Sequence, residues 1–266
     1  MFNLINTAHA AGDGISVHLD PVIVTHIAGV PITATLLTVW VTMIVLAVVA
    51  YFAGKNPTLV PSKLQNAFEM LIGGAYDYIE GVLEDKERTK TYFPIIMTIF
   101  LFVLAMNWMG LVPGVTSIGY WTGHGADLHL TPFFYPPGTD LNITIAFALI
   151  AFFTIEVAGI AAMGIWKYGG KFINFRGNSI GQRFLNFAIG LIELMSELAR
   201  LVAFSFRLFG NIFAGKVLLL VVMFLTTPYI LPVPLMAYEM FVGFIQAFIF
   251  AILTLYFIKL ATEEPH

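Results

Sequence analysis

Long runs of apolar residues, separated by short polar segments, dominate this sequence. Five runs are long enough for a spanning helix, which needs about 20 mostly apolar residues to cross a hydrocarbon core of about 30 Å. We expect an external N-terminal segment at residues 1–31 and a single transmembrane domain at residues 32–266. Its predicted spans lie near residues 32–53, 93–112, 142–166, 183–226 and 232–258. The pattern predicts an all-α integral membrane protein.

The fourth run is longer than one crossing requires. As a single helix, residues 182–225 would extend about 65 Å at about 1.5 Å per residue, roughly twice the thickness of the hydrocarbon core. Such a helix must tilt steeply, bend or lie partly across the membrane, and the candidate bending points are Gly190, Gly210 and Gly215. Together with the fifth run it forms a long, steeply tilted helix hairpin in the predicted fold.

A surface helix is predicted between the first two spans, near residues 62–84. Apolar side chains recur there at helical spacing, opposite charged ones such as Lys63, Asp77 and Glu84. This amphipathic pattern is typical of a helix that lies on a membrane surface.

The 13 basic residues indicate the orientation of the chain. Outside the spans they gather in the first and third connections, and residues 1–54 and 113–141 contain none. Because basic residues favour the cytoplasmic side, we expect the N-terminus outside and the C-terminus and surface helix inside. A bacterial inner membrane is the expected location, with an organelle inner membrane as the alternative.

Composition excludes several classes of protein. Hydrophobic residues make up 59%, charged residues 11%, and the mean hydropathy is +0.86, whereas soluble domains carry about a quarter charged residues. This balance excludes an ordinary cytosolic enzyme, a nucleic-acid-binding protein and a disordered chain. No enzyme motif is recognisable, so we predict no catalytic residue and no cofactor. His124 and His129 have no strong third ligand nearby, so no metal site is predicted either.

Three basic residues, Arg200, Arg207 and Lys216, lie inside the fourth run. A cation at the centre of a spanning helix costs roughly 2.5–3.5 kcal/mol, so each needs a partner or water. Glu197 lies three residues before Arg200, a spacing at which the two can pair as structural support. Arg207 has no acid three or four positions away and cannot lose its proton in practice. We therefore expect its counter-ion to come from another chain.

Polar residues in the last two runs occupy two faces. Glu193 lies fourteen positions before Arg207 on the same helical face, whereas Lys216, nine positions after Arg207, points the opposite way. Glu239 and Gln246 are seven residues apart and share a face of the fifth run. Lys216 and Glu239 could pair as a structural bridge or line a hydrated proton path, and both alternatives stay open.

The segment SFRLFGNIFAGK, at residues 205–216, resembles the signature of subunit a of F-type rotary ATP synthases. Four further segments resemble the same family at matching spacing: VPSKLQNAFEML at 60–71, MNWMGLVPG at 106–114, TDLNITIAFAL at 139–149 and IQAFIFAILTLYFI at 245–258. The resemblance implies a non-catalytic, proton-conducting stator subunit. In this family two offset half-channels load and unload the carboxylates of a c-subunit ring, which couples proton flow to rotation and ATP synthesis.

The resemblance also implies roles for single positions. Arg207 matches the essential arginine that faces the c-ring carboxylate, and Asn211 matches the asparagine beside it. Glu193 and Ser196 match polar positions of the inner half-channel. The implied partners are the c-subunit ring, b-type peripheral stalk subunits, the rest of the F0F1 complex and membrane lipid.

Three residues match positions of the outer half-channel: Lys216, Glu239 and Gln246. The family usually has an acid or a histidine where this chain has Lys216, and a lysine does not titrate as easily near neutral pH. Whether Lys216 relays protons or only tunes Glu239 is therefore open. On the residues alone, two other classes also stay open: a secondary transporter that binds an anionic solute at Arg207, and a structural membrane anchor.

Overall fold

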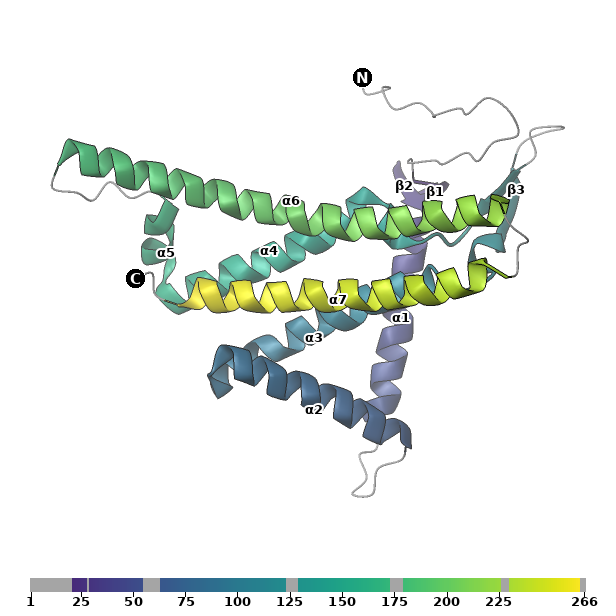
Figure 1. The fold of residues 1–266 in the computed structure, drawn as a ribbon, viewed down its shortest axis with the longest axis horizontal. Coiled ribbons are helices and arrows are strands. Elements are labelled where there is room, and N and C mark those ends of the chain that lie inside the picture. The colour runs from purple at the N-terminus through teal and green to yellow at the C-terminus, as the bar shows by residue number, and fades with distance from the viewer. Residues whose placement is uncertain are drawn as a thin grey trace. The chain divides into compact units, whose positions relative to one another are not determined.

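The computed structural model describes residues 21–27, 29–54, 63–122, 129–172, 179–225 and 230–263. Helices form most of these ranges (Figure 1). The seven α-helices of the described chain are α1 (Ala34–Gly54), α2 (Lys63–Leu83), α3 (Lys86–Met109), α4 (Leu141–Met163), α5 (Ile165–Phe172), α6 (Ile180–Leu225) and α7 (Pro232–Thr262). Two short 3-10 helices, η1 (Val115–Ser117) and η3 (Pro137–Thr139), lie between α3 and α4.

Five of these helices, α1, α3, α4, α6 and α7, are long and apolar enough to cross a membrane. This confirms the predicted all-α integral membrane fold with five spanning helices. Over the described ranges, α6 is one unbroken helix of 46 residues that continues past all three candidate bending glycines (Figure 1). At about 1.5 Å per residue it extends roughly 69 Å.

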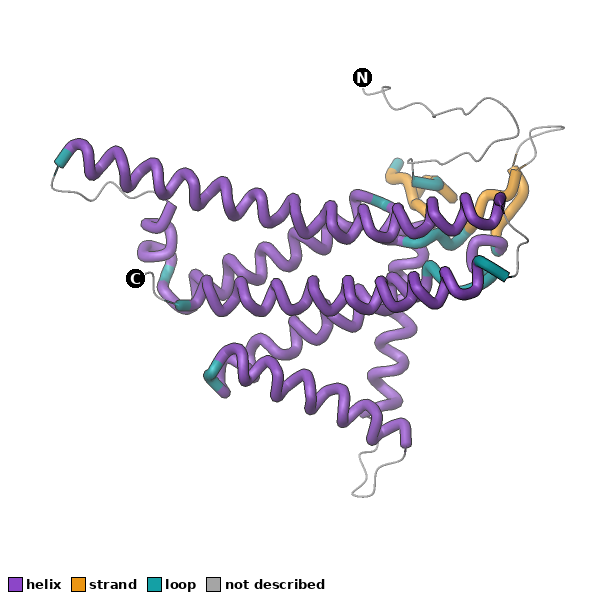
Figure 2. The backbone as a smooth tube through the Cα atoms, viewed as in Figure 1, coloured by secondary structure: helices purple, strands orange, loops and turns teal. Residues whose placement is uncertain are grey.

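Two short antiparallel β-hairpins, drawn in orange in Figure 2, were not predicted. Strand β1 (Ile23–Ile27) pairs with β2 (Val30–Thr33), and β3 (Gly119–Thr122) pairs with β4 (His129–Pro132). The Tyr120 hydroxyl donates a hydrogen bond of 2.9 Å to the carbonyl of Val24 and so joins the two hairpins. A search for runs of about 20 apolar residues cannot detect strands of four or five residues.

The chain divides into two compact units, and α3, α4, α6 and α7 each contribute to both. The first unit consists of Met1–Leu59, Phe100–Ile143 and Leu208–Phe248. The second unit consists of Val60–Ile99, Thr144–Arg207 and Ile249–His266.

In the first unit, buried threonines on one face of α1 hold the segment that leads into α4. Thr35 Oγ1 donates a hydrogen bond of 2.7 Å to Asp140 Oδ2. Asp140 Oδ1 in turn accepts from the backbone N–H of Asn142 at 3.0 Å, which caps the start of α4. Thr38 Oγ1 accepts a hydrogen bond of 3.0 Å from the backbone N–H of Tyr135.

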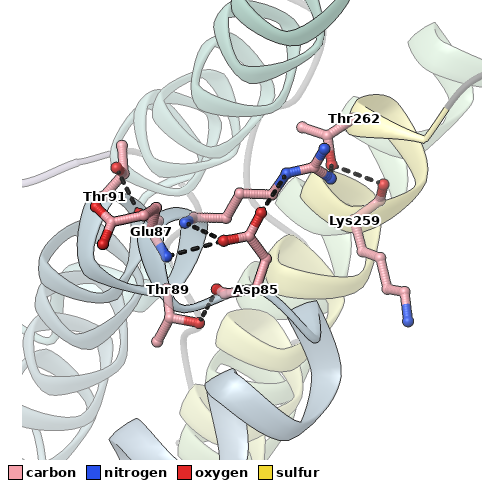
Figure 3. Close-up of polar contacts among 7 residues, drawn as sticks. Asp85, Glu87, Thr89, Thr91, Lys259 and Thr262 are labelled. Atoms are coloured by element: carbon pink, nitrogen blue, oxygen red, sulfur yellow. Dashed lines mark hydrogen bonds and ion pairs between the residues drawn. The ribbon is translucent and has the colours of Figure 1, made fainter.

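In the second unit, a cap and two cross-links fix the turn between α2 and α3. Figure 3 shows the Asp85 cap and the contact made to Thr262. Glu84 adopts the left-handed conformation with φ 56°, and Asp85 Oδ1 accepts hydrogen bonds from backbone N–H groups in the first turn of α3. Arg88 Nη1 donates to Thr262 Oγ1 at 3.3 Å, and Lys259 Nζ lies 3.2 Å from Glu84 Oε1. Because Lys259 and Thr262 belong to α7, both contacts tie α7 to the α2–α3 turn.

Candidate functional site

Arg207 lies on α6 at the end of a segment of the second unit. Its side chain is half-buried, and its Nη1 atom is buried without a hydrogen-bond partner in the described ranges. The guanidinium carbon is 5.9 Å from the centroid of the Phe204 ring. A buried N–H group that lacks a partner destabilises the fold by about 1–3 kcal/mol, more for a charged group. The position is therefore suited to binding an anion.

Arg200, one heptad before Arg207 on the same helix, has a different environment. Its Nη1 forms an ion pair of 2.5 Å with Glu197, whose side chain is nearly fully buried. Its guanidinium carbon also lies 3.8 Å from the centroid of the Phe257 ring. Arg200 thus has both an acid and an aromatic ring within its own chain, which favours the structural interpretation of this pair.

Glu193 and Ser196 lie on α6 in the second unit. Glu193 is half-buried and Ser196 is exposed. Ser196 Oγ donates a hydrogen bond of 2.9 Å to the carbonyl of Ile192, the usual way for a serine to satisfy its hydroxyl within an apolar helix. The inner half-channel roles of both residues stay predictions.

A small cavity in the first unit brings together Lys216 of α6 and Glu239 of α7. Its volume is about 50 Å³. One water molecule needs about 10–15 Å³ by this measure, so the cavity has room for more than one. The lining residues are Asn107, Gly110, Leu111, Pro136, Ile212, Lys216, Leu219 and Glu239.

Glu239 is buried, with only 6% of its surface exposed. Its carboxyl group packs directly against Gly215 of α6, where an added Cβ would overlap both carboxyl oxygens. Gly215 thus serves for close approach of a side chain, rather than as the bending point that the sequence suggested.

Lys216 contacts an aromatic ring instead of an acid. Its Nζ lies 3.3 Å from the centroid of the Tyr135 ring. Within the described ranges Lys216 and Glu239 share a cavity wall but form no ion pair, so the structural bridge considered from the sequence is not formed. The ammonium group is held by a cation–π contact.

Asn211 and Gln246 join α6 to α7 within the first unit. Asn211 Nδ2 donates a hydrogen bond of 2.7 Å to Gln246 Oε1. Gln246 is 2% exposed, and its Nε2 atom has no partner in the part of the chain that is described. The sequence places Gln246 on one helical face with Glu239. The structure adds its hydrogen bond with Asn211, and Gln246 is not among the residues that line the cavity.

Sequence reasoning missed Tyr135 and the role of Asn107. Tyr135 precedes two prolines in a connection between spans, and no local pattern relates it to Lys216, which lies far along the chain. Asn107 of α3 lines the cavity and donates a hydrogen bond of 3.0 Å from Nδ2 to the carbonyl of Gly243. An asparagine within an apolar helix indicates a buried hydrogen bond, but the sequence does not show which group accepts that bond.

A second buried polar group lies in the second unit, where α5 packs against α4. The ring of Tyr168 packs so closely on Gly159 that an added Cβ would overlap it. Burial, and next the neighbouring Glu156 carboxyl, raise the pKa of Tyr168, so its phenol stays protonated.

Ionisable groups inside membrane-length helices are rare, and they mark ion pathways or partner contacts. This chain combines five such helices, an arginine without an anion in the described ranges, and a cavity lined by a lysine and a glutamate. These features define a multi-pass membrane protein with ionisable groups inside its membrane-length helices.

Comparison with known proteins identifies the family. The sequence profile of the family described as ATP synthase A chain matches residues 36–259. The ATP synthase subunit a of Geobacter sulfurreducens is 34% identical over 228 residues, which cover 85% of this chain and 86% of that protein. That of Moorella thermoacetica is 30% identical over 241 residues, covering 91% and 96%. The chain belongs to the ATP synthase A chain family, which confirms the resemblance found in the sequence.

Proposed function

We propose that this chain is the non-catalytic, proton-conducting stator subunit of the membrane sector of an F-type ATP synthase. The observation that carries the proposal is the Arg207 guanidinium, which lies in an apolar helix with a buried, unpartnered Nη1 in the described ranges. Family membership supports the same function, because the matched relatives are named ATP synthase subunit a.

Arg207 acts on a carboxylate carried by a ring of c subunits. Such a carboxylate crosses the lipid-facing side of the ring only when it is protonated, because a bare anion in hydrocarbon is costly. Near Arg207 the permanent positive charge stabilises the ionised carboxylate. The same charge repels a proton that would leak directly between the two half-channels. Asn211, one turn further along α6, lies beside this contact.

Protons reach the ring from outside through the cavity between α6 and α7. Glu239 is the exchanging group, and water in the cavity connects it to neighbouring polar atoms. Lys216 lies in the wall of the same cavity, and Gln246 extends the polar path by its contact with Asn211.

Protons leave a ring carboxylate on the inner side past Glu193 and Ser196 of the second unit. Each charge that crosses the membrane potential delivers about 2.3 kcal/mol per 100 mV, and this energy turns the ring. The long helix α6 follows the curved flank of the ring, which accounts for its excess length over one crossing.

The expected location is a bacterial inner membrane, with the C-terminus in the cytoplasm. Helix α2 then lies on the inner membrane surface, where its charged face meets water and headgroups. The partners are the c-subunit ring, b-type stalk subunits and the rest of the F0F1 complex.

Replacement of Arg207 by alanine tests the proposal. In the complete complex reconstituted into vesicles, Arg207→Ala should abolish ATP-driven proton pumping and raise passive proton leak, because the barrier between the half-channels is lost. The matched control combines Glu197→Gln with Arg200→Gln, which removes an arginine of the same helix together with its own acid. This control should retain coupled pumping, whereas normal pumping by Arg207→Ala would reject the role.

Purification tests the partner directly. A small, two-helix ring subunit that bears a carboxylate should co-purify with this chain. A secondary transporter would instead take up its solute without any ring, and a structural anchor would tolerate replacement of both Arg207 and Glu239.

A further inference from the structure

We infer that Tyr135 is a positioning residue that binds the Lys216 ammonium group and keeps it away from Glu239, so that Glu239 remains free to exchange protons. The inference deepens the proposed function and rests on the assignment of this cavity to the outer proton path. It also decides the question that the sequence left open, because a lysine bound in this way is a fixed cation and not a relay.

The contact between Lys216 and Tyr135 is short and direct. The ammonium nitrogen lies 3.3 Å from the ring centroid, well within the distance of about 6 Å at which a cation is attracted to an aromatic face. Lys216 is half-buried, so loss of this contact would not be replaced fully by bulk water. In the described ranges the ring is the one partner that stabilises the charged form of Lys216.

Tyr135 is itself held in place from two sides. Its backbone N–H donates to Thr38 Oγ1 at 3.0 Å, and Thr38 is completely buried on α1, where its hydroxyl donates to the carbonyl of Ala34 at 2.9 Å. The next residue, Pro136, packs so tightly on Gly110, in the turn after α3, that a Cβ at that glycine would overlap the proline ring. The backbone on both sides of the aromatic ring is therefore held by buried contacts.

Few charged groups surround the ammonium. Of the residues that line the cavity, Lys216 of α6 and Glu239 of α7 are the charged ones, and α3 contributes the neutral Asn107. The group on α1 that faces Tyr135 is the neutral Thr38. Asp140, at the start of α4, accepts hydrogen bonds from Thr35 and Asn142 and does not line the cavity.

Release of the ammonium would change the chemistry of Glu239. A lysine side chain has four flexible carbons, and Lys216 and Glu239 already line one cavity. Without the ring, the ammonium can reach the carboxylate and form an ion pair. An ion pair stabilises the ionised form of a carboxylate, which then accepts a proton less readily. Tyr135 prevents this ion pair from forming, and the positive charge of Lys216 remains in the cavity wall.

The experiment measures ATP synthesis by the complete complex in liposomes, driven by a constant potassium diffusion potential, while the pH on the Glu239 side is varied. Tyr135→Leu should slow synthesis at neutral pH and move the pH of half-maximal rate by about one unit to the acid side, the usual effect of a close opposite charge. Tyr135→Phe, which keeps an aromatic face, should restore the normal profile.

The double variant Tyr135→Leu with Lys216→Gln distinguishes the formation of a Lys216–Glu239 ion pair from a non-specific effect of the substitution on folding or assembly. It has no ammonium to trap Glu239, so its profile should coincide with that of Lys216→Gln alone. A normal profile for Tyr135→Leu would overturn the inference, as would a double variant that is more defective than Lys216→Gln alone. Rates are normalised to the amount of assembled complex, and Tyr135→Met supplies the test where Tyr135→Leu fails to assemble.

Glu239→Gln, measured beside these variants, distinguishes the inference from the proposed function. A slow Glu239→Gln complex together with a normal Tyr135→Leu complex overturns the role of Tyr135 alone. A normal rate for Glu239→Gln removes the cavity from the proton path, and it overturns both the inference about Tyr135 and the outer path of the proposed function.

Discussion

Two arginines on one face of α6 show how environment gives the same side chain different roles. Arg200 has a buried acid three residues earlier and an aromatic ring from α7. Arg207 has a buried N–H without a partner in the described ranges. Since an arginine stays charged at any physiological pH, its environment can change only the identity of its partner. The sequence showed that Glu197 stands at a spacing from which it can pair with Arg200, and the structure forms this pair.

The partner of Lys216 could not be predicted in the same way. Spacing placed Lys216 and Glu239 on neighbouring helices, which made an ion pair plausible. The structure gives the ammonium the ring of Tyr135, from a connection in which nothing marks this tyrosine as a partner. Such a contact depends on packing between distant segments, which no local pattern encodes.

Gly215 provides a prediction at the residue scale. Gly215→Ala should displace the Glu239 carboxyl group, because the added methyl overlaps both of its oxygens, and proton-driven ATP synthesis should slow severalfold. The matched control is Gly181→Ala on the same helix, where an added Cβ meets nothing within 4 Å. Equal rates for the two variants would show that the position of the Glu239 carboxyl does not matter for proton uptake.

Among the elements, helix α3 differs most from its expected bounds. The apolar run predicted a start near residue 93, whereas the helix begins at Lys86. Its first turn is polar, so hydropathy does not reveal it, but Asp85 caps this turn and Arg88 ties it to α7. Hydropathy therefore predicts the apolar centre of a spanning helix. The residue at which its polar end begins is set by capping and tertiary contacts, which the structure shows.

A cap substitution is the prediction at this scale. Asp85→Ala removes the acceptor for the first backbone N–H groups of α3 and should destabilise this turn by about 1 kcal/mol. Amide hydrogen exchange at Arg88 should become about five times faster in consequence. Asp77→Ala, on the exposed face of α2, serves as the control and should leave this exchange unchanged. Equal protection of Arg88 in both variants would contradict the role of the cap.

At the scale of the whole molecule, the residues proposed for the outer half-channel and those proposed for the inner half-channel belong to different compact units. Asn211, Lys216, Glu239 and Gln246 all belong to the first unit, whereas Glu193, Ser196 and Arg207 belong to the second. The five spans and the family were predictable from hydropathy and from ordered motifs, because both are local properties of the chain. The two hairpins and the contact of Tyr135 with Lys216 depend on contacts between distant segments and were not predictable.

The most direct test of the account is the structure of the intact complex purified from its native membrane, resolved at the side chain of Arg207. We predict that the closest anion to the Arg207 guanidinium is a carboxylate of a c subunit, which faces this chain across the interface with the ring. A guanidinium neutralised by an acid of its own chain, or turned away from the ring, would contradict the account.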